Sequence, residues 1–199
     1  MKERTIIRYR KGFYFTLIGV LFFQCQNTPV ETDPLFLPEG FESKVFVDKI
    51  SETTRHIVVS PQGTVYTKFK KTSKEGSLAA MKDFDGDGVA DSLVKFANDT
   101  TIKGNGYATA ARIYKGYLYF SSELAVYRYK LDPDQLVPKG PLETVVIDDH
   151  PHGMHEHIGK PIAFDNKGNL YVPFGAPSNT CQNPKRTPLQ PGMDPCPQL

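Results

Sequence analysis

The sequence has almost no charge imbalance, no membrane-length hydrophobic run and no helical periodicity. Its net charge of +2 gives no reason to expect a phosphate-rich partner, so we expect no nucleic-acid binding. The mostly apolar run at 12–23 is shorter than the roughly 20 residues that a membrane-spanning helix needs. No segment after residue 24 repeats its apolar residues with a 3.6-residue period, which argues against a helical domain.

Turn-forming and aromatic residues are abundant instead, although tryptophan is absent. The 199 residues include 16 glycines, 16 prolines, 10 tyrosines and 13 phenylalanines. Glycine and proline suit tight turns, and aromatic side chains suit strands. The composition is therefore typical of an all-β secreted domain.

The amino terminus is typical of an export signal. Five basic residues lie among the first eleven, the apolar run follows, and the chain becomes polar after Cys25. A cysteine in this place indicates a bacterial lipoprotein, in which Cys25 carries a lipid that anchors the protein to the membrane. The preceding Phe22, Phe23 and Gln24 depart from the usual small residues, so a cleaved signal with an incidental cysteine is the alternative. The expected organisation is a signal at 1–25, a polar tether at 26–34, and a domain at 35–199 in the periplasm or cell envelope.

Two of the three cysteines lie outside the signal. An oxidising compartment would join Cys181 to Cys196. The bond would close a loop of roughly 15 residues, for which chain entropy suggests about 3 kcal/mol of stabilisation. The alternative is a pair of free thiols in a disordered tail.

A short pattern recurs three times: an apolar strand, a tight turn with glycine, and an apolar residue followed by tyrosine. The copies lie at 57–66, 111–119 and 162–171, and their tyrosines are 53 and then 52 residues apart. A period near 50 with about four short strands per unit is the signature of β-propeller blades. Chance matches within a β-sandwich are the alternative.

Three repeats cannot close a propeller, because a closed ring needs at least four blades. We therefore expect a truncated β-propeller with about three blades present. Before the first repeat, alternation at 41–47 predicts a half-buried strand.

An acidic loop at 83–91 matches much of a calcium-binding pattern. Carboxylates at loop positions 1, 3, 5 and 9, and glycine at position 6, can deliver oxygen ligands around a sharp turn. The predicted ligands are Asp83, Asp85, Asp87, Asp91 and the carbonyl of Val89. The twelfth position, normally glutamate, is Val94, so the pattern is incomplete. A structural calcium site and a plain Asp/Gly turn both remain open.

Four histidines crowd into eight residues: His150, His152, His155 and His157. Imidazole binds zinc and copper, but the spacing is not that of a zinc protease, because position 159 is glycine. A solvated histidine-rich loop is the simplest reading. A third reading is a catalytic base, since neutral histidine can accept a proton from a hydroxyl group.

Several segments carry a resemblance when they are taken together: Leu37–Phe41, Arg55–Gly63, Gly116–Ser122 with Val126–Tyr129, and His157–Asp165 with Gly168–Val172. They are similar to the first three blades of the glucose/sorbosone dehydrogenase family. Two further segments, Ser178–Gln182 and Pro191–Cys196, are similar to the sorbosone-type branch in particular. The resemblance covers residues 35–199.

The resemblance implies a six-bladed propeller that binds pyrroloquinoline quinone (PQQ) and calcium at its axis and oxidises a sugar at C1. It assigns His157 as the catalytic base, Glu156 as a substrate contact, and Lys160 as a cofactor contact in place of the commoner arginine. The remaining quinone and axial calcium ligands of the family lie in later blades. The implied partners are a sugar and an electron acceptor such as a quinone or a cytochrome. A non-catalytic binding propeller and a lactonase-type hydrolytic propeller are the alternatives.

Overall fold

The computed structural model describes residues 35–98, 101–102, 110–148, 157–176 and 178–197. The chain divides into two units at Phe41/Glu42, and all strands belong to the second unit. The expected signal at 1–25, with Cys25, and the tether at 26–34 lie outside the described residues. Within the described part, no helix is long and apolar enough to cross a membrane.

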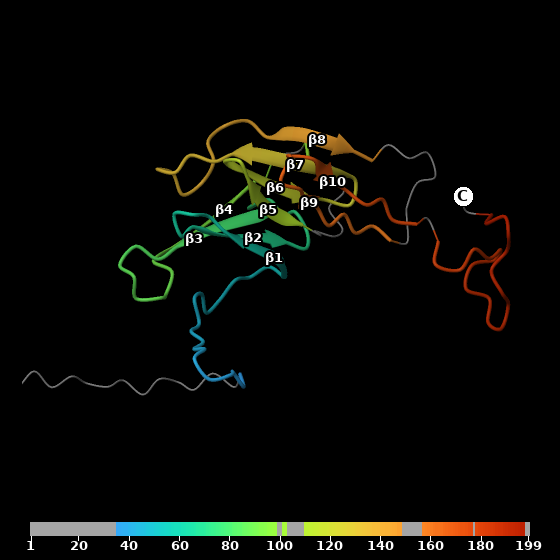
Figure 1. Ribbon diagram of the computed structural model, residues 1–199, viewed down its shortest axis with the longest axis horizontal. Coiled ribbons are helices and arrows are strands. Elements are labelled where there is room, and N and C mark those ends of the chain that lie inside the picture. The colour runs from blue at the N-terminus through green and yellow to red at the C-terminus, as the bar shows by residue number, and fades with distance from the viewer. Residues whose placement is uncertain (1–34, 99–100, 103–109, 149–156, 177, 198–199) are drawn as a thin grey trace, which may run out of the picture. The chain divides into compact units, whose positions relative to one another are not determined.

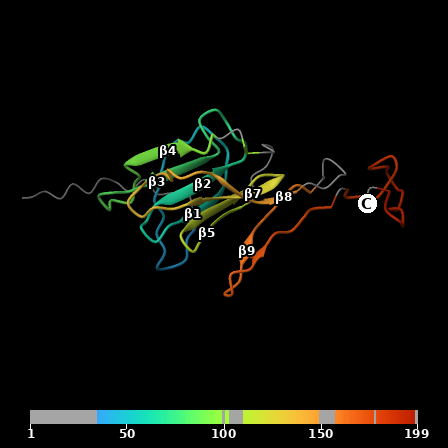
Figure 2. The same cartoon turned by 90° about the horizontal axis from the view of Figure 1, so that it is seen from above.

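Two four-stranded antiparallel sheets form the main body, and each follows the chain without a crossover (Figure 1). The first contains β1 (Thr54–Val59), β2 (Val65–Phe69), β3 (Leu78–Lys82) and β4 (Ser92–Phe96). The second contains β5 (Ala111–Tyr114), β6 (Tyr117–Ser121), β7 (Ala125–Lys130) and β8 (Glu143–Ile147). Strands β1 and β5, the first of each sheet, lie side by side (Figure 2).

The three sequence repeats correspond to three hairpins, as predicted. The first two are β1–β2 and β5–β6, and the third pairs β9 (Ala163–Phe164) with β10 (Leu170–Tyr171). Two complete blades are therefore present, but in the described residues the third repeat is only a short hairpin rather than a full blade. Pro173 follows this hairpin closely and has no N–H to donate to a continuing sheet.

The two blades pack face to face through buried aromatic and aliphatic side chains. Tyr66 and Ala80 are cross-strand partners on one face of the first blade, and both contact a cluster that includes Phe120 and Tyr127 of the second. Phe96 and Tyr129 extend this contact, with ring centroids 6.0 Å apart. Burial of these faces against each other is the main stabilising term available to a small β unit.

A second cluster holds the β9–β10 hairpin against the other face of the second blade. Tyr119, Val126 and Ile162 are buried there. Phe164 stacks on Tyr114 with a centroid distance of 4.3 Å and meets the edge of Tyr119 at 4.7 Å. The start of the third repeat is thus fixed by packing rather than by sheet hydrogen bonds to its neighbour.

The strand predicted at 41–47 is not formed, and this prediction was wrong. The segment 42–47 has one backbone hydrogen bond to the blade, in which Ala90 N–H donates to Phe46 O over 2.9 Å. Val45, Phe46 and Val47 line a groove with Val65 and Met81, but Val45 stays 57% exposed, so the alternation of the sequence does not correspond to alternating burial. An alternating pattern therefore does not by itself require a paired strand.

Candidate functional site

The first strands of the three repeats, β1, β5 and β9, all end on the same side of the blades. The turn after β1 shares a hollow with the turn after β5, which Ser60 and Gly116 both line. Tyr114, at the end of β5, donates its hydroxyl hydrogen to Asp165 O, directly after β9, over 3.4 Å. We call this side the exit end. The opposite side, where the three strands begin, is the entry end.

His157 lies at the entry end, six residues before β9 begins. Its side chain is exposed, and its backbone N–H donates to Ala176 O over 3.3 Å. Ala176 lies beyond β10, so this bond joins the two arms of the third hairpin past the end of their strand pairing. The backbone is therefore held while the imidazole faces solvent.

Gly175 makes a close approach to His157 that only glycine permits. A Cβ atom on Gly175 would lie 1.6 Å from the carbonyl oxygen of His157 and 2.7 Å from its Cβ. Carbon and oxygen atoms that are not bonded normally stay more than 3 Å apart. The sequence pattern gave no sign of this constraint, because an isolated glycine after a strand is read simply as a turn residue.

Lys160 is buried three residues after His157, with a side chain only 1% exposed. Its Nζ lies 2.7 Å from Oδ2 of Asp148, whose side chain is 3% exposed, and it donates a hydrogen bond of 2.5 Å to Glu123 O. The Lys160–Asp148 contact is a close, buried ion pair. Ser121 Oγ in turn donates to Lys160 O over 2.9 Å.

The ion pair connects the end of the second blade to the segment that carries His157. Asp148 directly follows β8, and Lys160 precedes β9. Sequence reasoning missed Asp148, because an aspartate after an exposed edge strand carries no signal of burial. The cofactor contact predicted for Lys160 stays a prediction.

The other residues of the histidine-rich segment lie outside the described residues. These are His150, His152, His155 and Glu156. The substrate contact predicted for Glu156 therefore stays a prediction, as does the choice between His155 and His157 as base.

The acidic loop between β3 and β4 brings three of its four carboxylates together. Candidate ligand oxygens of Asp83, Asp85 and Asp91 all lie within 4.8 Å of one another, which is a spacing that a metal ion could bridge. The fourth carboxylate, that of Asp87, lies outside this group and accepts the Val89 N–H over 2.7 Å. The predicted Val89 carbonyl ligand stays a prediction.

Hydrogen bonds within the loop set the shape of this acidic group. Asp83 accepts backbone N–H groups from Gly86 and Gly88, each over 2.7 Å. These bonds, with that from Gly88 first, lower the pKa of the Asp83 carboxyl. Gly88 has φ of +85°, which a residue with a side chain rarely adopts. The loop joins β3 to β4 and therefore lies at the exit end, away from His157.

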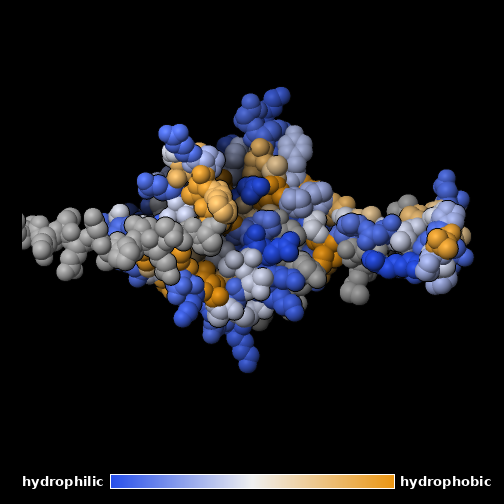
Figure 3. All heavy atoms as spheres, turned by 90° about the horizontal axis from the view of Figure 1, so that it is seen from below, coloured by the Kyte–Doolittle hydropathy of each residue, from blue (hydrophilic) through white to orange (hydrophobic). Residues whose placement is uncertain are grey.

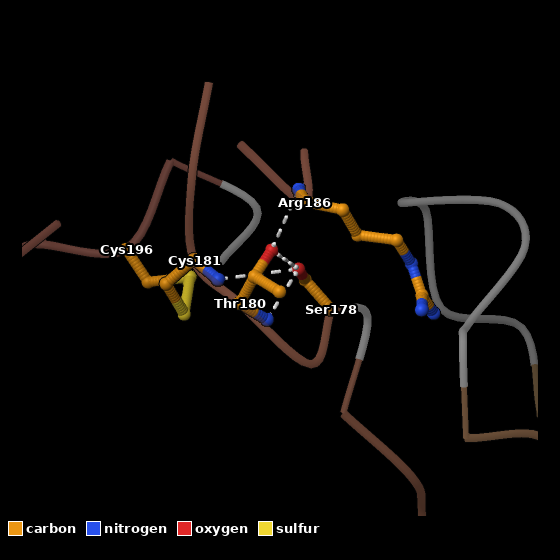
Figure 4. The surroundings of a disulfide bond; sticks show 5 residues. All are labelled: Ser178, Thr180, Cys181, Arg186 and Cys196. Carbon is orange, nitrogen blue, oxygen red and sulfur yellow. Dashed lines mark hydrogen bonds between the residues drawn. A yellow bond between two sulfur atoms is a disulfide. The ribbon is translucent and has the colours of Figure 1, made fainter. Parts of the chain in front are cut away.

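The chain after the third hairpin folds into a loop closed by the predicted disulfide. Cys181 and Cys196 are bonded, with Cα atoms 4.8 Å apart (Figure 4). Ser178 Oγ accepts the backbone N–H groups of Thr180 and Cys181 over 3.1 and 3.2 Å. Met193 N–H donates to Cys181 O over 2.7 Å, and this bond holds the end of the loop against its beginning. The disulfide-closed loop begins at Cys181, five residues after Ala176, the backbone partner of His157.

No known protein family and no curated protein matches this sequence. Solved structures do match. The PQQ domain of pyranose dehydrogenase from Coprinopsis cinerea, in its holo form, is 16% identical, with a TM-score of 0.51 over 65% of this chain and 30% of that one. Two Trichoderma reesei structures of Carbohydrate-Active Enzymes Family AA12, an iodide and a calcium structure, are 17% and 15% identical. Their TM-scores are 0.53 and 0.52, over 68% and 74% of this chain and 33% and 40% of theirs.

These likenesses concern the fold, because the sequence identity is low. The chain spans less than half the length of each matched structure. Its two four-stranded antiparallel sheets match part of the propeller of a PQQ domain. The chain therefore has the fold of part of a β-propeller, as its repeats predicted.

Proposed function

We propose that this chain supplies the base-bearing blades of a PQQ-dependent sugar dehydrogenase. The observation that carries the proposal is the place of His157: exposed, held through its backbone, and at the entry end of blades that match a PQQ-domain propeller. Both the matched pyranose dehydrogenase domain and the AA12 structures come from enzymes of carbohydrate chemistry by their names. The resemblance to glucose/sorbosone dehydrogenases points the same way.

In this proposal His157 removes the proton from the C1 hydroxyl of an aldose or sorbosone-like sugar. PQQ, when bound, would supply the acceptor for the hydride of C1, so that the sugar would lose two electrons and two hydrogens in total. A neutral imidazole nitrogen suits the first task, because its proton affinity is matched to neutral pH. The backbone bond to Ala176 and the contact with Gly175 limit the positions that the imidazole can reach.

The acidic loop would hold calcium in a structural role. Asp83, Asp85 and Asp91 offer the carboxylate oxygens that calcium prefers, and the Asp87 side chain would have to leave the Val89 N–H to join them. Since the loop lies at the exit end, such an ion would stabilise the β3–β4 connection and would not contact the sugar.

The protein would act outside the cytoplasm and pass electrons to a further acceptor, a quinone or a cytochrome. The disulfide between Cys181 and Cys196 is consistent with an oxidising compartment. Lipidation of Cys25 would tether the domain to a membrane, where such acceptors are found.

Dye-linked oxidation of glucose and sorbosone tests the proposal, after reconstitution of the full-length protein with PQQ and Ca²⁺. Activity that requires added PQQ supports it. Lactone hydrolysis without PQQ would instead identify a hydrolytic propeller. Binding of sugar without either activity would identify a binding propeller.

A further inference from the structure

Three nitrogen-bearing side chains project from the entry ends of the two first strands. Arg55 and His56 are the second and third residues of β1, and Arg112 is the second residue of β5. Strands β1 and β5 lie side by side and end on the same side, so these three residues, the entry-end cluster, lie at the same end of the two strands. Both arginines are exposed, and His56 is half-buried.

Among the described residues, the charged groups that act on His56 are all cationic. Its pKa is lowered first by burial and then by the charges of Arg55, Arg112 and Lys68. Lys68 is the cross-strand partner of His56, is 2% exposed, and has its own pKa lowered by burial to about 8. Its Nζ donates to Phe69 O over 2.9 Å, and a backbone carbonyl does not neutralise its charge.

Neither arginine of the cluster has an acidic partner among the described residues. Arg112 donates one guanidinium hydrogen to Ala111 O over 2.9 Å and forms no ion pair there, and Arg55 forms none either. The third arginine of the two described blades, Arg128, does have an acidic partner, since it lies 2.7 Å from Glu143.

The contrast between Arg55 and Arg112, which have no acidic partner among the described residues, and the paired Arg128 indicates an anion-binding site. Unpaired cations that share one end of adjacent strands repel one another, and a bound anion removes that repulsion. Arginine in particular presents a planar fork that matches a carboxylate with two parallel hydrogen bonds. On the side where β1 lies in Figure 1, hydrophilic surface occupies the centre of the face and apolar surface flanks it (Figure 3).

We propose that Arg55, His56 and Arg112 form a polycarboxylate-binding site at the entry end, and that its ligand is PQQ, which carries three carboxylates. The identity of the ligand rests on the proposed function, because it places PQQ at the same end as His157. Arg55 and Arg112 bind carboxylates, and the His56 imidazole donates one hydrogen bond. These contacts would come from the blades described here rather than from later ones.

Equilibrium titration of the full-length protein with PQQ, followed by its absorbance and by fluorescence quenching, tests the site without any turnover. Arg55→Gln and Arg112→Gln should each weaken PQQ binding by about tenfold or more, the effect of losing one charged hydrogen bond. Lys139→Gln is the matched control, since Lys139 is exposed on the β7–β8 connection at the exit end, and it should change binding less than twofold. Far-UV circular dichroism checks that the variants fold.

Citrate is the second probe and separates a general polycarboxylate site from one shaped for the quinone. Competition by citrate that Arg55→Gln or Arg112→Gln abolishes supports the anion site. Loss of PQQ binding in these variants supports the inference even when the wild type oxidises no sugar, in which case only the proposed function fails. Wild-type protein that binds neither probe, or binding that both arginine variants leave unchanged, overturns the inference.

Discussion

The ammonium group of Lys160 lies 2.7 Å from the carboxylate of Asp148, in the buried space between the second blade and the segment that carries His157. A second contact, from Lys160 Nζ to Glu123 O, adds the turn between β6 and β7. The Lys160 side chain thus connects its own segment to the end of β8 and to the β6–β7 turn. Because both charged groups are buried, removal of either partner strongly lowers the free energy of unfolding.

Breaking this ion pair should destabilise the protein strongly. Lys160→Met and Asp148→Asn should each lower the free energy of unfolding by about 3–5 kcal/mol, because each leaves a buried group without its charge partner. The double variant Lys160→Met/Asp148→Leu should recover much of that loss, since an apolar pair needs no charge balance. Urea unfolding measures all three. Lys167→Met, on the exposed β9–β10 turn, should change stability by less than about 0.5 kcal/mol. Single variants as stable as the wild type would contradict the pair's structural role.

His157 should be the proton acceptor in sugar oxidation. General-base catalysis contributes about 10²–10⁴ in rate, so His157→Gln should lower turnover by that order. PQQ binding should change far less. The assay is dye-linked oxidation by the reconstituted protein.

His155→Ala is the internal control for this assignment, and its effect should be milder. A result in which His155→Ala abolishes activity and His157→Gln does not would move the base by two residues. If neither matters, the histidine segment has no catalytic role.

Gly175→Ala should lower activity through His157. The added Cβ would lie 1.6 Å from His157 O, so the segments that carry Gly175 and His157 must move apart, which displaces the imidazole relative to the blades. We expect turnover to fall about tenfold or more, because small displacements of catalytic groups are costly. Gly140→Ala is the matched control: nothing lies within 4 Å of its Cβ position, and it should behave as wild type. Unchanged turnover in Gly175→Ala would show that the close contact does not constrain the base.

The acidic loop should bind calcium and gain stability from it. Added Ca²⁺ should raise the melting temperature of the wild type, and a chelator should reverse the gain, because a ligand of the folded state stabilises it. Asp83→Ala should remove the response, and Asp134→Ala, in another exposed loop, should keep it. Differential scanning calorimetry with and without Ca²⁺ measures this. An identical response in Asp83→Ala would place the ion elsewhere.

Much of the fold could be predicted because each blade is encoded locally. The repeated strand–turn–Tyr pattern marks the β1–β2, β5–β6 and β9–β10 hairpins, and the sheets add only sequence neighbours to them. The disulfide followed from cysteine count and compartment. The predicted strand at 41–47 failed because apolar alternation does not show whether a segment will pair with a neighbouring strand, and Val45, one of the alternating residues, is exposed.

The site was less predictable, because its supports depend on contacts between distant segments. Nothing around Asp148 in the sequence shows that it is buried against Lys160, and nothing around Gly175 shows that it touches His157. Arg55 and Arg112 are 57 positions apart in the sequence, and they lie at the same end of the blades because β1 and β5 are neighbours. Pattern reasoning finds residues whose roles depend on their own segment and misses those whose roles depend on packing.

The order of the strands has a consequence for how the chain folds. Among the described residues, every hydrogen-bonded strand pair joins consecutive strands, so each of the two four-stranded sheets is built from one continuous stretch of the chain. Local pairing of this kind favours rapid folding, and domains form from the amino terminus as synthesis proceeds. The first blade can therefore form on the ribosome before the second has emerged. The second blade would then pack against a face of the first blade that has already formed, the face that carries Tyr66 and Ala80.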